Sequence, residues 1–199
     1  MEAENGGRIS RELAWRMQGL ELETLIERAR NQDAEALGEI YRRYVRRVSG
    51  LCRHLLGSRE NAEDATSEVF LKLQRFLGTY DGSTPFPAWL LRVAGNQCID
   101  ILRRRQLLVE DPEGKAALEA PSPEPSPLGA VIGAEERAQV RKAISALPEN
   151  YRVPLVLRYY GELSYDEIAA QLGVESGHVG ALIFRAKQEL RRKLRNILS

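Results

Sequence analysis

Hydrophobic residues recur at steps of three and four along the first half of the chain, which is the spacing of an amphipathic helix. One such stripe predicts a helix that ends near Gly57, a residue suited to helix termination. Ser58 then offers an N-cap for a second helix, whose acidic first turns suit the positive end of the helix dipole. The first stripe consists of Leu37, Tyr41, Tyr44, Val48, Leu51 and Leu55, and the second of Ala62, Ala65, Val69, Phe70, Leu73 and Leu77.

A third helix follows a segment rich in residues that break regular structure. This segment has the sequence TYDGSTPFP, and its Asp-Gly pair and two prolines predict a turn. The helix after it has the sequence PAWLLRVAGNQCIDILRRR, with Leu90, Val93, Ala94, Gln97 and Ile101 on one side. No alternating strand pattern appears in this block, so the sequence predicts an all-α protein.

Residues 109–134 differ from both flanks because they hold five of the nine prolines. Four of these alternate with other residues from Pro121 to Pro127, which excludes both a helix and a strand ladder. The segment is predicted to be a flexible, acidic linker that reaches roughly 80 Å if polyproline-like and about 30 Å as a coil. It divides the chain into an N-terminal extension (1–21), a helical block (22–108), the linker (109–134) and a second helical block (135–199).

The second block ends in the pattern of a helix-turn-helix motif. Ser164 and Glu167 have the spacing of a capping box for a short helix, and Gly173 is placed to end it. A longer helix then begins at Glu175 or Ser176, with Val179, Ile183, Ala186 and Leu190 as its buried stripe. The second helix of such a motif typically enters the DNA major groove. A plain helical hairpin with a basic end is the alternative, and the cap, the turn glycine and the small residues favour helix-turn-helix.

Composition narrows the classes of function. With 43% hydrophobic and 29% charged residues among 199, the chain is expected to be a soluble globular protein. No apolar run could cross a membrane and the polar N-terminus lacks the order of a signal peptide, which favours a cytoplasmic protein without membrane insertion. Cys52 and Cys98 lie far apart without metal-ligand spacing, so neither a metal nor a cofactor is expected. Two histidines and no glycine-rich phosphate signature disfavour an enzyme.

The charge is unevenly distributed along the chain. Residues 22–108 carry 14 Lys and Arg against 11 Asp and Glu, and residues 135–199 carry 11 against 8. Between them, the linker holds one lysine and five acidic residues. Two basic blocks around an acidic spacer indicate two modules that face nucleic acid, although on charge alone ordinary solvated surfaces explain the balance equally well.

Four strings, in this order and around this linker, resemble the extracytoplasmic-function (ECF) group of bacterial RNA polymerase sigma factors, within the sigma-70-like family. They are DAEALGEIYRRY, ENAEDATSEVFLKL, FPAWLLRVAGNQCIDILRRR, and LPENYRVPLVLRYYGELSYDEIAAQLGV followed by FRAKQEL. The resemblance spans roughly residues 22–108 and 135–197. It implies that the first block is sigma domain two, a bundle of three or four helices, and that the second is sigma domain four.

In this family the second of these strings docks on the clamp coiled coil of core polymerase. The resemblance therefore implies that Asp64, Glu68, Phe70 and Leu73 bind polymerase. Helix-end electrostatics explain Glu60 and Glu63 adequately, whereas Asp64 and Glu68 lie deeper in the predicted helix. A basic partner explains those two acidic residues better.

The third string corresponds to the segment that melts and reads the minus-ten promoter element. By resemblance, Asn96 and the loop from Asp81 to Phe86 hold an extruded base of the non-template strand, and Arg103, Arg104 and Arg105 hold backbone phosphates. Asp100 is expected instead to pair with Arg104 along the helix.

Two aromatic residues flank this segment. Trp89 lies beside the apolar stripe and is expected to pack in the core. Phe86, predicted to lie in a loop between two prolines, is equally suited to base stacking and to packing, and it joins the candidates for minus-ten binding.

The recognition helix departs from the family pattern. Where members usually present a basic or polar run, this chain has Gly180, Ala181 and Leu182, which offer almost no hydrogen-bonding groups. The remaining candidates for minus-thirty-five contact are Ser176, His178, Arg185 and Lys187. His178 either reads a base or merely lies at the helix start. Phosphate anchoring is thus expected to exceed base readout in this domain.

The resemblance implies a non-catalytic sigma factor whose partners are core RNA polymerase, promoter DNA and an anti-sigma factor. The two promoter elements lie two helical turns, about 70 Å, apart. The reach predicted for a polyproline-like linker, roughly 80 Å, agrees with this separation. Two rivals remain: a free-standing helix-turn-helix repressor with a helical sensor domain, and an adaptor that holds another regulator through the first block.

Overall fold

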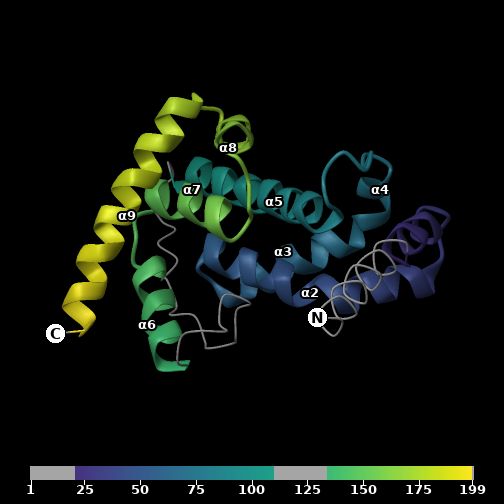
Figure 1. The fold of residues 1–199 in the computed structure, drawn as a ribbon, viewed down its shortest axis with the longest axis horizontal. Helices are drawn as coiled ribbons and strands as arrows, with labels where there is room; N and C mark the ends of the chain where they lie inside the picture. Colours follow the sequence, from purple (N-terminus) through teal and green to yellow (C-terminus); the bar gives the residue numbers. More distant parts are fainter. Residues whose placement is uncertain (1–20, 110–133, 199) are drawn as a thin grey trace, which may run out of the picture.

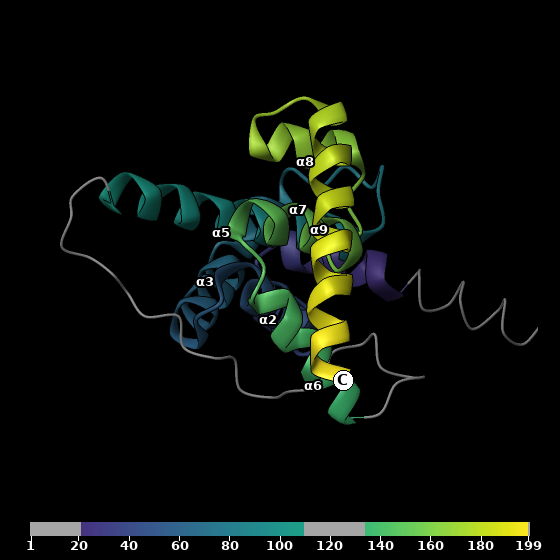
Figure 2. The same cartoon turned by 90° about the vertical axis from the view of Figure 1, so that its left-hand side faces the viewer.

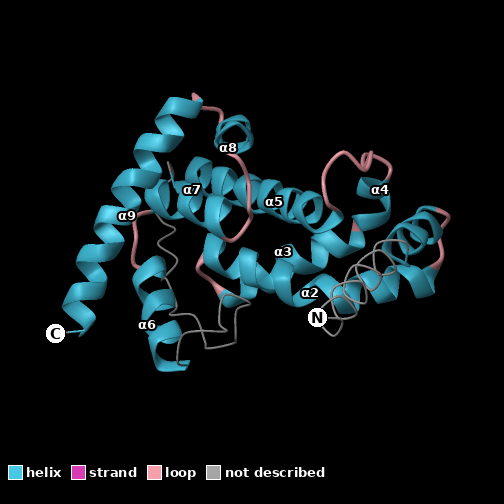
Figure 3. Cartoon of the chain, viewed as in Figure 1, coloured by secondary structure: helices cyan, strands magenta, loops and turns pink. Residues whose placement is uncertain are grey.

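The computed structural model describes residues 21–109 and 134–198, and every regular element within these ranges is a helix (Figures 1 and 3). The predicted all-α class is therefore confirmed. The N-terminal extension and the acidic linker of the sequence analysis fall almost wholly outside the described residues. None of the helices in the described ranges is both long enough and apolar enough to span a membrane.

The first long helix, α2 (Ala34–Leu56), is delimited by its own sequence. The Asp33 carboxylate accepts hydrogen bonds from the backbone N–H groups of Glu35 and Ala36, which caps the N-terminus. At the other end Gly57 adopts a φ of 71°, in the left-handed region that glycine enters without steric cost. The predicted stop at Gly57 is confirmed.

A helix over residues 21–30 precedes α2, and the sequence analysis does not predict it. Leu25, Ile26 and Ala29 of this helix are buried, and Leu22 packs against the core. Their spacing of three, four and seven from Leu22 is that of a helical face, so the periodicity was present in the sequence.

The predicted second helix is divided into α3 (Arg59–Leu71) and α4 (Leu73–Leu77). Ser58 caps α3 as predicted, because its hydroxyl accepts a backbone N–H of the first turn. Lys72 separates the two helices, and its N–H is shared between two carbonyls of the preceding turn. This tight turn interrupts the apolar stripe that was predicted to be continuous.

Helix α5 (Phe86–Val109) runs across the middle of the molecule and packs against both α2 and α3 (Figure 1). Its buried side is formed by Leu90, Leu91, Ala94, Cys98, Ile99 and Leu102. The helix at 21–30 and α2 to α5 are called the N-terminal helices below.

The C-terminal helices are α6 (Ala134–Ser145), α7 (Glu149–Tyr159), α8 (Tyr165–Leu172) and α9 (Ser176–Leu198). Ser164 and Glu167 form the predicted capping box at the start of α8, with both reciprocal hydrogen bonds present. Gly173 ends α8 with a φ of 69°. A short helix, a glycine turn and a long second helix thus form the predicted helix-turn-helix, and α9 runs past α8 at one end and α6 at the other (Figure 2).

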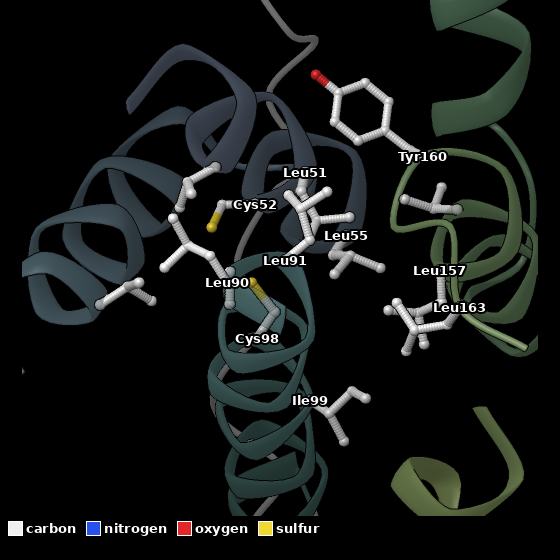
Figure 4. Packing of buried hydrophobic residues seen from close by; sticks show 14 of the residues in the cluster. Leu51, Cys52, Leu55, Leu90, Leu91, Cys98, Ile99, Leu157, Tyr160 and Leu163 are labelled. Atoms are coloured by element: carbon white, nitrogen blue, oxygen red, sulfur yellow. The ribbon is translucent and has the colours of Figure 1, made fainter. Parts of the chain in front are cut away.

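The N-terminal and C-terminal helices share one hydrophobic core. Helix α7 lies against α2, and α8 contacts α5. Leu51 and Leu55 of α2 face Leu157 and Leu163 across this contact (Figure 4), and all four side chains are buried. The two helical blocks, which the sequence predicts as separate modules, are packed together here.

Candidate functional site

An exposed apolar patch with an acidic border lies on α2 and α3. Leu71 is 84% exposed, and Tyr41 meets the Phe70 ring edge-on with the ring centroids 4.9 Å apart. Asp64 is exposed and lies two turns before Leu71, so helical spacing puts the two on the same face of α3. We call Tyr41, Asp64, Phe70 and Leu71 the α2–α3 surface. Exposed apolar side chains gathered in this way are typical of a protein-binding site.

The other two residues predicted to bind polymerase lie differently. Leu73 is 1% exposed and belongs to the core. The Glu68 carboxylate is engaged within the chain: Lys72 pairs with Oε1, and the Gln97 amide donates to Oε2 at 2.6 Å. Glu68 therefore joins α3 to α5, and its free acceptor capacity for a partner is reduced.

Sequence analysis missed two members of the α2–α3 surface. It assigned Tyr41 to the apolar stripe of the first helix, and the side chain is 47% exposed. Leu71 was not singled out at all. Leu71 lies one residue away from the positions that form the apolar stripe of α3. This position could have identified it as a surface leucine.

On α5, Asn96 and Arg104 are exposed, and Arg105 is partly exposed. Asp100 is also exposed, and among the described side chains no ion pair joins it to Arg104, so the expected pairing is wrong. Spacing places Asn96, Asp100 and Arg103 along one side of the helix, away from the buried stripe. On this side the amide of Asn96 suits hydrogen bonding to a base edge, and the guanidinium groups suit hydrogen bonding to phosphates.

Two arginines of this side contact the helix-turn-helix. Arg92 forms an ion pair with Glu167 of α8. Arg103 donates to the backbone carbonyl of Gln171 at 2.9 Å, and the Gln171 amide donates to the carbonyl of Arg92 at 3.3 Å. The predicted phosphate-binding Arg103 is therefore occupied by α8 in this arrangement.

Phe86 is the first residue of α5 and not a loop residue, and it is 1% exposed. Its ring packs against Tyr44, Tyr80 and Trp89, with centroids 5.4 to 5.5 Å apart. The loop position expected for Phe86 is wrong, and in this arrangement the ring is not available to a base. Trp89 is 7% exposed, so its expected core position is confirmed.

The loop before α5 is ordered by its own polar groups. The Asp81 carboxylate accepts the backbone N–H of Ser83 at 2.9 Å, and hydrogen bonding from Ser83 lowers the pKa of Asp81. The Tyr80 hydroxyl donates to the Thr84 carbonyl at 3.0 Å. The loop is thus held in one shape beside the start of α5.

The outward side of α9 carries His178, Ala181, Arg185 and Gln188, all exposed and spaced by three or four residues. We call these four residues the α9 face. Gln188 was not predicted, although it follows Arg185 by three positions and its amide can read a base edge. The neighbouring Phe184 is 61% exposed and adds an apolar group.

Lys187 and Ser176 do not belong to the α9 face. The Lys187 ammonium lies 4.9 Å from the centroid of the Tyr159 ring on α7, a cation–π contact that holds it to the side of the helix. Ser176 is partly buried at the helix start. The structure therefore brings His178 and Arg185 together and places Ser176 and Lys187 elsewhere on α9.

The buried titratable groups of the described ranges include two cysteines. Cys52 and Cys98 are both buried in the core (Figure 4); the interaction with Cys98 lowers the pKa of Cys52, and the interaction with Cys52, together with burial, raises the pKa of Cys98. Within the part of the chain that the structure describes, no three His, Cys, Asp or Glu residues are gathered as a metal site would require.

Comparison with protein families gives two matches. The family model for sigma-70 region 2 matches residues 40–107, and the model for sigma-70 region 4 matches residues 137–190. The first match begins within α2 and ends near the end of α5, and it includes the α2–α3 surface and the exposed side of α5. The second covers the helix-turn-helix and the α9 face.

Several sequence relatives are similar over most of this chain. The ECF RNA polymerase sigma factor SigE of Mycolicibacterium smegmatis is 36% identical over 77% of this chain, which spans 59% of that relative. The RNA polymerase sigma-H factor of Pseudomonas aeruginosa is 31% identical over 87% of this chain and 94% of its own length. The ECF sigma factor SigW of Bacillus subtilis is 30% identical over 86% and 96%.

Two solved structures share the fold. The sigma factor RpoE of Bartonella quintana, in complex with the anti-sigma factor NepR, has a TM-score of 0.61 at 20% identity and covers 79% of this chain and 96% of its own. CnrH, in complex with the cytosolic domain of CnrY, has a TM-score of 0.54 at 22% identity and covers 87% and 96%.

Proposed function

Because the chain belongs to the extracytoplasmic-function group of the sigma-70 family, we propose that it gives RNA polymerase promoter specificity as a dissociable initiation subunit. The observation that carries this proposal is the order of the two family regions, region 2 on the N-terminal helices and region 4 on the C-terminal helices. The family consists of regulatory initiation factors and not of known catalysts. Residues 22–108 act as domain two, 109–134 as the linker and 135–199 as domain four.

Core polymerase docks on the α2–α3 surface. Leu71 and Tyr41 supply exposed apolar area, and Asp64 supplies a negative charge at its edge. A basic, partly apolar helical partner matches both properties. Glu68 contributes less than the resemblance implies because both of its oxygens are already bonded within the chain.

Domain two reads the minus-ten element and holds the melted strand along the exposed side of α5. The Asn96 amide contacts a base, and Arg103, Arg104 and Arg105 hold phosphates. Support comes from the exposure of Asn96 and Arg104 and from the ordered loop beside them. Phe86 is assigned to the core because of its aromatic packing.

Domain four anchors the complex at the minus-thirty-five element through the α9 face. Arg185 engages phosphates, while His178 and Gln188 are the groups able to reach base edges. Ala181 offers only an apolar contact to thymine methyl groups. Sequence preference in this region is therefore modest, and Lys187 contributes charge from the side of the helix.

An anti-sigma factor is the second protein partner. The proposal rests on two neighbours of the same fold, of which one was solved with the anti-sigma factor NepR and the other with the cytosolic domain of CnrY. Such a partner would compete with polymerase for the α2–α3 surface or hold the two domains together.

In vitro transcription tests this function directly. Purified core polymerase is supplied with genomic promoter fragments, with and without the full chain. Defined transcripts that require the chain are expected. Nanomolar, sequence-specific binding of duplex DNA by the isolated protein would instead favour a repressor, and the absence of any promoter-dependent transcript would favour an adaptor.

A further inference from the structure

Arg30, the last residue of the helix at 21–30, reaches across to the end of α4. Its Nε atom donates to the backbone carbonyl of Leu77 at 3.2 Å, and Nη2 donates to the carbonyl of Tyr80. The third nitrogen, Nη1, lies 3.3 Å from a carboxylate oxygen of Glu27 on the same helix. Every nitrogen of this guanidinium is therefore engaged within the chain, and two of its partners are 47 and 50 positions away in the sequence.

The end of α4 explains why an arginine stands at this position. A helix leaves its last carbonyl groups without intrahelical partners, and an arginine side chain nearby can donate to them. Leu77 is the last residue of α4, and the second carbonyl belongs to Tyr80 in the chain that leaves it. The planar guanidinium presents its donors in a fixed fork, which the single ammonium of lysine cannot reproduce. Arg30 therefore sets the position of Tyr80 relative to α4.

Tyr80 joins this arginine to the loop before α5. The Arg30 guanidinium lies over the Tyr80 ring, 5.9 Å from its centroid. The same ring packs against Phe86 and Trp89 of α5, with centroids 5.4 and 5.2 Å apart, and the hydroxyl donates to the carbonyl of Thr84. One residue thus connects the start of the loop, its far end and the first turn of α5.

The tip of the loop is exposed at Asp81, Gly82 and Ser83. Gly82 adopts a φ of 79°, in the left-handed region that favours glycine. A Cβ at Gly82 would lie more than 4 Å from every described atom beyond the adjacent residues, so the tip stands clear of the helices around it. The position of the tip therefore depends on how its two ends are held, by Tyr80 on one side and by α5 on the other.

We propose that Arg30 is a positioning residue for minus-ten recognition, which holds the loop before α5 in the shape that receives the extruded base. This inference rests on the proposed function, because it concerns the same minus-ten site. Arg30 acts through the Tyr80 carbonyl without contacting DNA, since its three nitrogens already bond within the chain. A loop held in its binding shape loses less conformational entropy when it binds. Without Arg30 that cost rises, and discrimination between bases at the loop falls.

The substitution Arg30→Gln tests the proposal on the full chain, with Arg28→Gln as the matched control. Arg28 lies two residues earlier on the same helix and pairs with Asp33 and Glu35 at the start of α2. Both variants therefore remove one arginine and its bonds from the same helix, but Arg30→Gln alone releases the loop. Holoenzyme made with each variant selects promoters from a library randomised over the minus-ten element. Titration with core polymerase measures the affinity of each variant for its partner.

Arg30→Gln is expected to reduce the preference for the favoured base at the position read by the loop by roughly three- to tenfold, a smaller loss than removal of a whole base contact. Affinity for core polymerase should be unchanged, and Arg28→Gln should keep the wild-type profile. An unchanged profile in Arg30→Gln would overturn the inference, as would an equal loss in both variants, because the helix and not the loop would then be responsible. If the wild type itself selects no minus-ten motif, the proposed function fails and the inference fails with it.

A double-mutant cycle distinguishes action through the loop from a direct contact with DNA. Asp81→Ala removes the hydrogen bond to the Ser83 N–H that shapes the tip, so the loop has little discrimination left for Arg30 to support. In this background Arg30→Gln is expected to cause almost no further loss of preference. Additive losses would overturn the proposal, because Arg30 would then act independently of the loop.

Arg30→Lys provides a second measurement should Arg30→Gln not fold. Lysine keeps the charge but not the fork, so a partial loss of preference of about twofold is expected. Hydrogen exchange at the Ser83 amide reports the order of the tip and should be faster in Arg30→Lys than in Arg28→Gln. Wild-type exchange at Ser83 together with a wild-type minus-ten profile would contradict a positioning role for Arg30.

Discussion

Arg92 on α5 and Glu167 on α8 form an ion pair between residues 75 positions apart in the sequence. The other Glu167 oxygen accepts the backbone N–H of Ser164 at 2.7 Å, so one carboxylate both caps α8 and holds that helix over α5. The start of the helix-turn-helix is thereby tied to the side of α5 proposed to bind DNA.

Reversal of the charge at Asp64 should abolish binding to core polymerase and leave the fold intact. Asp64 is exposed on the α2–α3 surface, so Asp64→Arg places a positive charge against a basic partner. Co-purification with core polymerase measures binding, and circular dichroism measures helix content. Glu60→Arg is the control, since it removes only a favourable charge at the start of α3, worth about 0.3–1 kcal/mol of stability. Equal binding by both variants would remove Asp64 from the docking surface.

Substitutions of two leucines near the end of α3 should have different effects, one on polymerase binding and the other on the free energy of unfolding. Leu71 is 84% exposed, so Leu71→Ala should weaken polymerase binding with little effect on the free energy of unfolding. Leu73 is 1% exposed, so Leu73→Ala should lower that free energy by about 2–5 kcal/mol. Urea titration and polymerase binding are measured on both. The assignment of Leu73 to the core fails if Leu73→Ala is as stable as the wild type.

Removal of the Asn96 amide should relax sequence preference at one minus-ten position. The exposed amide suits a base edge, and its loss should reduce discrimination there by about 1–3 kcal/mol. The measurement is promoter selection from a library randomised over the minus-ten element. Asp100→Ala, one turn further along the exposed side of α5, serves as the control and should keep the wild-type profile. An unchanged profile for Asn96→Ala would make this residue structural.

Charge on the α9 face should determine the salt dependence of upstream binding. Arg185→Ala is expected to weaken binding about equally on all minus-thirty-five sequences and to lower the salt slope by about 0.9. Lys187→Ala should have a smaller effect, because its ammonium is held against the Tyr159 ring. Holoenzyme binding is measured over a range of salt concentrations. A sharp minus-thirty-five motif that is lost in Gln188→Ala would show stronger base readout than we propose.

Stability should fall as the pH drops below neutrality because of His54. Burial, assisted by Arg141 and Arg53, lowers the pKa of His54 to about 4, whereas the unfolded chain binds this proton near pH 6.5. The stabilisation is therefore complete above pH 6.5 and is lost progressively towards pH 4. Between pH 7.5 and pH 5 the free energy of unfolding should fall by about 1–2 kcal/mol. His54→Gln should remove this part of the pH dependence in urea titrations.

Local features of the fold could be predicted from the sequence because they depend on neighbouring residues. The cap at Ser58, the capping box at Ser164 and the glycine stops at Gly57 and Gly173 each need only a few adjacent positions. The break at Lys72 was missed because neither proline nor glycine marks it. The helix at 21–30 was overlooked although its periodicity was present.

Features that depend on distant residues could not be predicted in this way. Glu68 and Leu73 both lie in the string expected to dock on polymerase, but contacts with Gln97 and with the core occupy them. Phe86 stands between two prolines in the sequence, and only the approach of Tyr44 and Tyr80 explains its burial. Likewise, nothing near Arg103 in the sequence indicates a bond to Gln171.

The fit of Tyr160 over Gly50 constrains how this protein can change through evolution. A Cβ at position 50 of α2 would overlap the Tyr160 hydroxyl and lie 2.9 Å from Cζ, so a larger residue there is compatible with this contact only if position 160 loses its ring. The two positions should therefore covary, with a small residue at 50 accompanying an aromatic residue at 160 in those descendants that retain this packing. A lineage that loses this reciprocity would have lost the packing of Tyr160 on α2.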